Sequence, residues 1–126
     1  MAVTYDTGAL LAAERYDRAM WALRAGFLAE EVVPVVPAPV LAEAWRGGPR
    51  QASLVRLLAL CVMEPMSYGQ ARAVGVLAGR AARDDIVDVT VVDGALGCRD
   101  AVVTSNLGHI ASIASAGRRR LRLDTV

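Results

Sequence analysis

Short apolar runs of strand type alternate with helix-type segments along the whole chain. β-branched residues favour strands, and a neighbouring proline ends a strand quickly. The expected strands are residues 2–5, the valines at 32, 33, 35 and 36, and residues 61–64, 101–103 and 121–123. This alternation is typical of helices packed around a parallel sheet. We therefore expect an α/β sandwich around a central, mostly parallel sheet of four to five strands.

The segments between these runs have helical composition. Proline suits the first turn of a helix, whereas glycine and proline together in residues 46–50 indicate a loop. The expected helices are residues 8–29 in two pieces that break at residues 15–18, a helix from Pro39, residues 51–60, residues 68–82 with interruptions at Gly75 and Gly79, residues 85–96, and a helix from Asn106. No repeat or linker divides the 126 residues, so one domain over 1–126 is expected.

The chain is apolar for a globular domain, with 55% hydrophobic residues and a mean hydropathy of +0.37. It contains no uncharged apolar run of about 18 residues, so a membrane span is not expected. We also expect no signal peptide, because no basic region precedes an apolar stretch and a cleavage site. Cys61 and Cys98 lack metal or redox spacing, which favours buried free thiols in a reducing, cytoplasmic location. The apolar helical segments 8–29 and 51–82 suggest a surface for a homodimer.

Basic and acidic residues are nearly equal in number, but the basic residues are all of one type. The net charge is +1, and all 14 basic residues are arginine. Guanidinium groups favour bidentate contact with phosphate. Nucleic-acid binding would therefore depend on a local patch of arginines, since the net charge is small. Residues 117–122 form one basic run, which is either a solvated terminus or part of such a patch.

Four carboxylates lie in apolar surroundings, where an ionised group is costly unless a cation or hydrogen bonds compensate it. Asp6 follows the first expected strand, at a strand end where ligands bind in parallel sheets, although an aspartate there also caps the next helix. Glu43 lies on a short helix, where it is either functional or a solvated charge. Asp85 and Asp88 share one helix face, and a capping box is the alternative. Oxygen ligands of this kind suit Mg²⁺ or Mn²⁺.

A polar segment at residues 104–106 follows the strand at 101–103, again at a carboxyl end. Asn106 is a good helix cap, and His109, the only histidine, follows on the first turn. Cap and structural roles are the alternatives to function for these two residues.

The joint pattern resembles the PIN domain, and the resemblance covers essentially the whole chain. It rests on residues 5–11, 40–43, 85–89 and 102–106, and residues 45–51 look specifically like actinobacterial VapC toxins. The resemblance implies a PIN-like α/β/α sandwich and a metal-dependent endoribonuclease inhibited by a VapB-type antitoxin. It further implies that Asp6, Glu43 and Asp88 are catalytic and hold Mg²⁺ or Mn²⁺, with Asp85 as a further metal carboxylate. Thr7 would steady Asp6, and Asn106 would occupy the polar position of the fourth motif.

The fourth motif departs from the family, because neither Asn106 nor His109 is acidic. A second metal site is thereby weakened, and a three-carboxylate site for a single cation is expected. Arg46 and Arg50, on the loop after Glu43, are the candidates for RNA phosphate contact, and Arg15 and Arg18 would extend the groove.

Two rival functions remain open. One is a catalytically attenuated PIN-fold module that binds RNA or antitoxin without turnover, because its fourth motif is not acidic. The other is a receiver-like regulatory domain, which also gathers acids at strand ends but needs a late lysine that this chain lacks.

Overall fold

The computed structural model describes residues 2–98, 101–116 and 122–126. The predicted buried thiol of Cys98 and most of the basic run at 117–122 lie outside the described side chains. Five strands form one sheet in which every pair is parallel, in the order β3-β2-β1-β4-β5. The strands are β1 (Val3–Tyr5), β2 (Val35–Pro37), β3 (Val62–Glu64), β4 (Ala101–Thr104) and β5 (Leu123–Thr125). The predicted α/β architecture and strand number are therefore confirmed.

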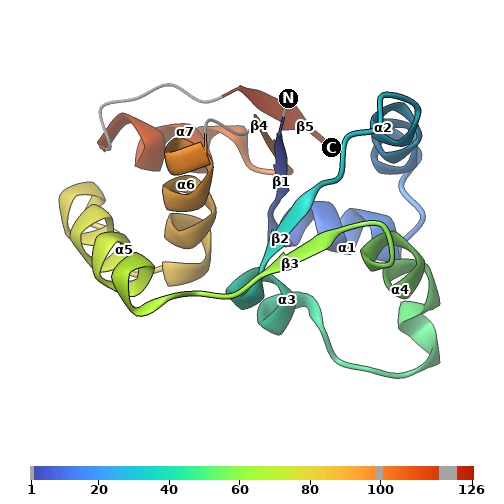
Figure 1. Ribbon diagram of the computed structural model, residues 1–126, viewed down its shortest axis with the longest axis horizontal. Helices are drawn as coiled ribbons and strands as arrows, with labels where there is room; N and C mark the ends of the chain where they lie inside the picture. The colour runs from blue at the N-terminus through green and yellow to red at the C-terminus, as the bar shows by residue number, and fades with distance from the viewer. Residues whose placement is uncertain (1, 99–100, 117–121) are drawn as a thin grey trace.

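The helices form two layers, one on each side of the sheet (Figure 1). One layer contains α1 (Thr7–Glu14), α2 (Arg18–Ala29) and α4 (Ala52–Leu58), and the other contains α5 (Tyr68–Ala81), α6 (Ile86–Cys98) and α7 (Leu107–Ala116). The short helix α3 (Ala38–Ala44) contacts both α1 and α6, and a 3-10 turn, η1 (Pro49–Gln51), precedes α4. Within the described residues, no helix is both long and apolar enough to cross a membrane.

The core lies where the central strands meet these layers. Every residue of β1 and β4 is buried, as expected for inner strands of a parallel sheet covered on both faces. The edge strand β3 is different, because Val62 and Met63 are exposed. Cys61, which precedes β3, is a free thiol that is only partly buried, so the expectation of a fully buried thiol is wrong at this position.

Three predicted boundaries need correction. The helix over 68–82 is continuous through Gly75 and Gly79. Both glycines face open space, so the missing side chain leaves no packing defect there. Strand β2 begins at Val35 instead of Val32, because the Val32 amide donates a hydrogen bond to Phe27 O (2.8 Å) and still completes the end of α2. The last strand begins at Leu123, which pairs with Val102, and Leu121 lies outside the described residues.

The predicted break between the first two helices is confirmed and has a local cause. Helix α1 ends at Glu14, and Tyr16 then adopts the left-handed conformation, with φ of 59°. Asp17 starts α2 by accepting a hydrogen bond from the Met20 amide (3.0 Å).

Candidate metal centre

The strand order places one edge of the sheet in a position suited to ligand binding. The chain moves from β1 outward to β2 and β3, and then crosses back to β4 on the other side of β1. The carboxyl ends of β1 and β4 therefore flank the point where the strand order reverses, which is the usual ligand crevice of open α/β sheets. Asp6 follows β1 there, and its amide donates to Val103 O of β4 (3.2 Å).

Asp6 is only 4% exposed, and its side chain accepts hydrogen bonds from three groups. Its Oδ1 accepts a hydrogen bond from the Ala9 amide (2.9 Å), so Asp6 caps α1. Burial raises the pKa of Asp6, as does the nearby Glu43 carboxylate, while hydrogen bonds from the Thr104 hydroxyl and the Ala9 and Gly8 amides oppose the rise. The cap and the predicted site are thus the same residue.

The hydroxyl that hydrogen-bonds Asp6 comes from Thr104 and not from Thr7. Thr7 is buried, and its Oγ1 has no hydrogen-bond partner among the residues described. The expectation that Thr7 steadies Asp6 is therefore corrected: Thr104, at the end of β4, has that role because the two central strands end side by side.

The three predicted catalytic carboxylates lie close enough together to affect the pKa values of Asp6 and Asp88. Glu43 is exposed on α3, and Asp88 is half-buried in the first turn of α6. Burial raises the pKa of Asp88 to about 6; His109 opposes this rise, and the carboxylates of Asp6, Asp85 and Glu43 add to it. The neighbouring carboxylates thus disfavour ionisation of Asp88, and a divalent cation would offset this repulsion.

Asp85, Asp88 and His109 offer ligand atoms that all lie within 4.8 Å of one another. His109 Nε2 is 2.9 Å from Asp88 Oδ2, and it also contacts Asp85 Oδ2. Among the residues described, no other three metal-ligating side chains converge this closely. Asp6 and Glu43 lie within electrostatic range of Asp88 but outside this group.

The group formed by Asp85, Asp88 and His109 has the donors that a divalent cation requires. Although partial burial acts to raise the pKa of Asp85, the hydrogen bond from His109 and its electrostatic attraction help to hold this pKa below the ordinary value. Asp85 Oδ1 is buried and has no hydrogen-bond partner in the described part of the chain. Carboxylate oxygens together with one imidazole nitrogen suit Mn²⁺ better than Mg²⁺, which prefers oxygen alone.

Asn106 and His109 have different places in the fourth motif. Asn106 caps α7, because its Oδ1 accepts from the His109 amide (3.2 Å), and its own amide donates to Thr104 Oγ1 (2.9 Å). The cap role is thus present, whereas the accessory role of Asn106 at the polar position of the fourth motif stays a prediction. His109 projects from the same turn to the carboxylates of α6. Sequence reasoning undervalued His109, although its place three residues after Asn106 was the available signal.

Gly8 allows the start of α1 to approach the turn after β4. A Cβ at this position would lie 2.0 Å from Ser105 Oγ, 3.0 Å from Ser105 Cβ and 3.3 Å from Asp6 Oδ1. Any side chain at position 8 would therefore displace Ser105, which precedes Asn106 in this turn, and crowd the Asp6 carboxylate.

The loop after Glu43 is fixed by one buried side chain. Gln51 Oε1 accepts hydrogen bonds from the amides of Arg46 and Gly47 (both 2.9 Å), and its Nε2 donates to Ala44 O (2.8 Å). Glu43, Arg46 and Arg50 line a common depression of about 350 Å³ with this loop. The arginine charges therefore lie beside a predicted catalytic acid.

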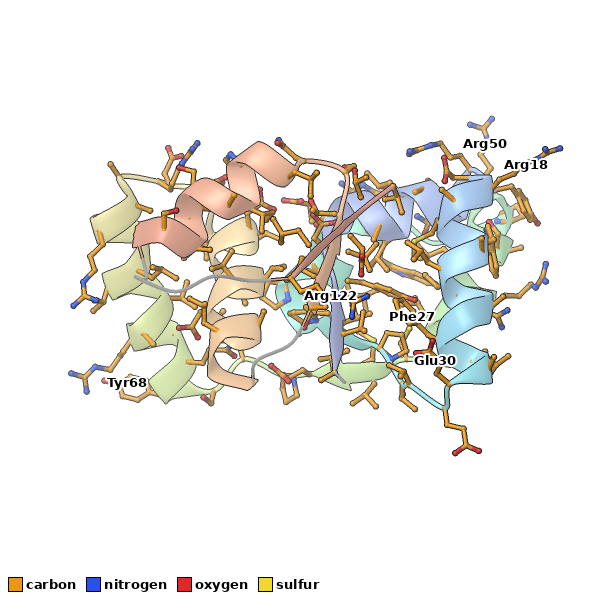
Figure 2. The ribbon with its side chains drawn as sticks, turned by 90° about the horizontal axis from the view of Figure 1, so that it is seen from above. Arg18, Phe27, Glu30, Arg50, Tyr68 and Arg122 are labelled. Atoms are coloured by element: carbon orange, nitrogen blue, oxygen red, sulfur yellow. The ribbon has the colours of Figure 1, made fainter. Side chains whose placement is uncertain are left out.

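Both Arg46 and Arg50 are exposed, and they are differently placed on the loop. Arg46 Nη1 donates to Trp45 O (2.7 Å), which holds it close to its own backbone. Arg50 and Arg18 extend outward at the same end of the molecule, as Figure 2 shows.

Comparison with known proteins shows the fold. No family model and no curated protein sequence matches the chain. A solved structure with a similar fold is the crystal structure of VapBC2 from Rickettsia felis bound to a DNA fragment from their promoter: a chain in it matches with a TM-score of 0.73 at 16% identity, over 100% of this chain and 99% of that one. A chain in the structure of FitAB bound to the IR36 DNA fragment matches with a TM-score of 0.65 at 15% identity, over 98% and 94%.

The fold is PIN-like. The structural likeness covers the whole sheet and both helical layers, so the fold class expected from the motifs is confirmed. Both similar structures are protein complexes bound to a DNA fragment.

Proposed function

We propose that this protein is a divalent-metal-dependent endoribonuclease toxin of the VapC type. The observation that carries the proposal is the gathering of Asp6, Glu43, Asp85, Asp88 and His109 at the switch point of a PIN-like sheet. Asp6, Glu43 and Asp88 act as the catalytic carboxylates, and Asp85 and His109 complete the metal-binding set.

The residues divide the work of phosphodiester cleavage by position. A bound Mg²⁺ or Mn²⁺ supplies an activated water and neutralises charge on the scissile phosphate. Asp6 and Asp88 hold the negative charge that attracts the cation, and Thr104 and the Ala9 amide fix the Asp6 carboxylate. Arg46 and Arg50 bind phosphates of the RNA beside Glu43.

The central test is RNA cleavage by the purified protein with Mn²⁺, compared with EDTA and with Asp6→Asn. Asparagine caps a helix about as well as aspartate, so this variant removes the charge and keeps the start of α1. We expect cleavage with Mn²⁺, none with EDTA, and none by Asp6→Asn at unchanged thermal stability. Cleavage that survives both chelation and the substitution would refute the proposal that the protein is a metal-dependent nuclease.

The attenuated binding module is the second candidate, favoured by Asn106, which caps α7 and is not acidic. It predicts RNA binding without cleavage across total RNA, with Mn²⁺ present. Binding measured by gel shift in the same samples separates this result from a protein that does not recognise RNA.

The arginines of the loop give a second prediction. In Arg46→Gln and Arg50→Gln we expect KM for RNA to rise roughly threefold each, as for exposed charge contacts. The salt dependence of RNA binding should weaken by about 0.7 in log–log slope for each phosphate that a variant no longer binds. Arg72→Gln is the matched control, because Arg72 lies over the Tyr68 ring (5.9 Å) on α5, at the end of the molecule opposite Arg50 in Figure 2. An unchanged slope in both loop variants would remove Arg46 and Arg50 from the RNA contact.

A third prediction concerns His109, measured as metal binding by titration calorimetry without RNA. If His109 is a ligand, His109→Ala should weaken Mn²⁺ binding at least about tenfold. His109→Asp should narrow the preference for Mn²⁺ over Mg²⁺, because it replaces nitrogen by oxygen. Tighter Mn²⁺ binding in His109→Ala would instead show that the imidazole only balances the charge of Asp85 and Asp88.

The partners follow from the same proposal. The two structural relatives are toxin–antitoxin complexes, which supports a VapB-type antitoxin as inhibitor, and action on cellular RNA places the protein in the cytoplasm. A homodimer is proposed from the exposed Val62 and Met63 on edge strand β3. Size-exclusion chromatography with light scattering tests the dimer, and a monomer at high micromolar concentration would exclude it.

A further inference from the structure

A second cavity, which shares no residue with the acidic cluster, lies between α2 and the segment that follows α4. Its volume is about 350 Å³. Most of its walls are apolar, and they include Phe27, Leu28, Val32, Leu57 and Leu60. Figure 2 shows Phe27 reaching from α2 toward the strands, and its ring centroid is 6.3 Å from that of Tyr5. Pockets of this size and lining bind small molecules through a few polar groups.

Two polar side chains that line this cavity each have an atom without a hydrogen-bond partner among the residues described. Tyr5 is fully buried, and its hydroxyl has no hydrogen-bond partner among the residues described. Arg24 Nε is buried and also lacks a partner in the described part of the chain. Buried donors without an acceptor are costly, and native structures contain few of them. Two such donors at one cavity indicate an acceptor that the described residues do not supply.

The charges around the cavity favour an anion. Arg24 is held in place by the Trp21 ring, 5.1 Å from its guanidinium carbon, and the described ion pairs include none to Arg24. Burial raises the pKa of Cys61 to about 11 and raises that of Tyr5 as well, so both are neutral at pH 7. Cys61 Sγ already has a partner, Leu57 O (3.4 Å). Glu31 is the one acid in the described lining, and it is exposed to solvent.

We infer that this cavity binds a small amphipathic carboxylate. Its carboxylate accepts hydrogen bonds from Arg24 Nε and the Tyr5 hydroxyl, and its apolar body packs against Phe27 and Leu57. A water molecule's share of liquid volume is about 30 Å³, so the cavity has room for roughly ten non-hydrogen atoms. Octanoate has this size and chemistry.

The test is direct binding by titration calorimetry, without RNA or metal, so its outcome is independent of the proposed nuclease. The probes are octanoate, 1-octanol and octylammonium, which share one chain length. We expect octanoate to bind at least tenfold more tightly than octanol, and octylammonium to bind more weakly than both. Equal affinity for octanoate and octanol, or no binding of octanoate at millimolar concentration, would overturn the inference; the former would identify a purely apolar pocket.

Variants locate the site. Arg24→Gln should reduce octanoate affinity at least tenfold and leave octanol unchanged, while Tyr5→Phe should reduce it about threefold. Arg56→Gln is the matched control, because Arg56 also lies over Trp21 (5.5 Å) but does not line the cavity. Thermal unfolding confirms that each variant is folded. Unchanged octanoate affinity in folded Arg24→Gln refutes the assignment.

Discussion

Asp88→Asn is expected to lower the rate of RNA cleavage roughly a thousandfold, which corresponds to about 4 kcal/mol less transition-state stabilisation by the metal site. Asp88 is the residue that links the predicted catalytic carboxylates with the group formed by Asp85, Asp88 and His109. Mn²⁺ binding measured by calorimetry should disappear together with activity. Full Mn²⁺ affinity in this variant would exclude Asp88 as a ligand.

The same substitution should stabilise the metal-free protein at neutral pH. The pKa of Asp88 is about 6 in the folded protein against an ordinary value of 3.8. A raised pKa contributes stability that is fully present below the ordinary value and is lost as the pH rises through about 6. Asparagine carries no such charge, so at pH 7 we expect a gain of about 1 kcal/mol after allowing for solvent screening, or about 4 °C in Tm.

The matched control for this prediction is Asp93→Asn. Asp93 lies on the same helix, and burial also raises its pKa, but its side chain hydrogen-bonds Gln70 away from the acidic cluster. It should therefore retain both Mn²⁺ binding and cleavage. Equal loss of activity in both variants would point to a general defect of α6. If Asp88→Asn in EDTA is less stable than wild type at pH 7, then burial and charge repulsion at Asp88 do not destabilise the metal-free protein.

Gly8→Ala is expected to reduce cleavage roughly tenfold while the protein stays folded, because a displacement of about 1 Å in an active site costs about a hundredfold and the shift needed here is smaller. The new Cβ meets Ser105 Oγ at 2.0 Å and Ser105 Cβ at 3.0 Å, so the hydroxyl must rotate away and the turn after β4 must give way by a few tenths of an ångström. That turn carries the caps that place His109 opposite Asp88. Steady-state kinetics should show the loss in kcat.

A second-site change tests the cause. Ser105→Gly removes both clashing atoms, so the double variant Gly8→Ala with Ser105→Gly should recover most of the lost rate. Gly75→Ala is the control, since open space surrounds Gly75 in α5; it should retain activity and gain up to about 1 kcal/mol of stability. An unrescued double variant would mean that Gly8 acts through its own backbone or its contact with Asp6.

The sequence predicted the sheet well because its inner strands are short, β-branched and buried on both faces, as in β4. It failed where local signals conflict with tertiary contacts. Gly75 and Gly79 look like helix breaks, yet packing of Val74, Leu77 and Ala78 against the core keeps α5 continuous. The register of β5 depends on pairing with β4, which the residues of β5 alone do not encode.

The sequence could predict those residues of the candidate site that directly follow a strand, because the strand end determines where they lie. Asp6 was placed at the carboxyl end of β1, and its double use as cap and site residue follows from that position. The contact of His109 with Asp88 could not be predicted, because it depends on how α7 packs against α6. Thr104 was overlooked in favour of Thr7, since only the parallel pairing of β1 with β4 brings its hydroxyl to Asp6.

Gln51 anchors the backbone of the loop before it, so side chains of this loop can be replaced without loss of the anchor. Its hydrogen bonds reach only backbone atoms of Ala44, Arg46 and Gly47, so the anchoring does not depend on which side chains the loop carries. Gly47 and Gly48 are constrained by positive φ (76° and 97°), whereas positions 46, 49 and 50 carry no such backbone constraint. Under the proposed function, RNA preference can therefore diverge at these positions, in evolution or by grafting, while the acids of the candidate metal centre stay in place.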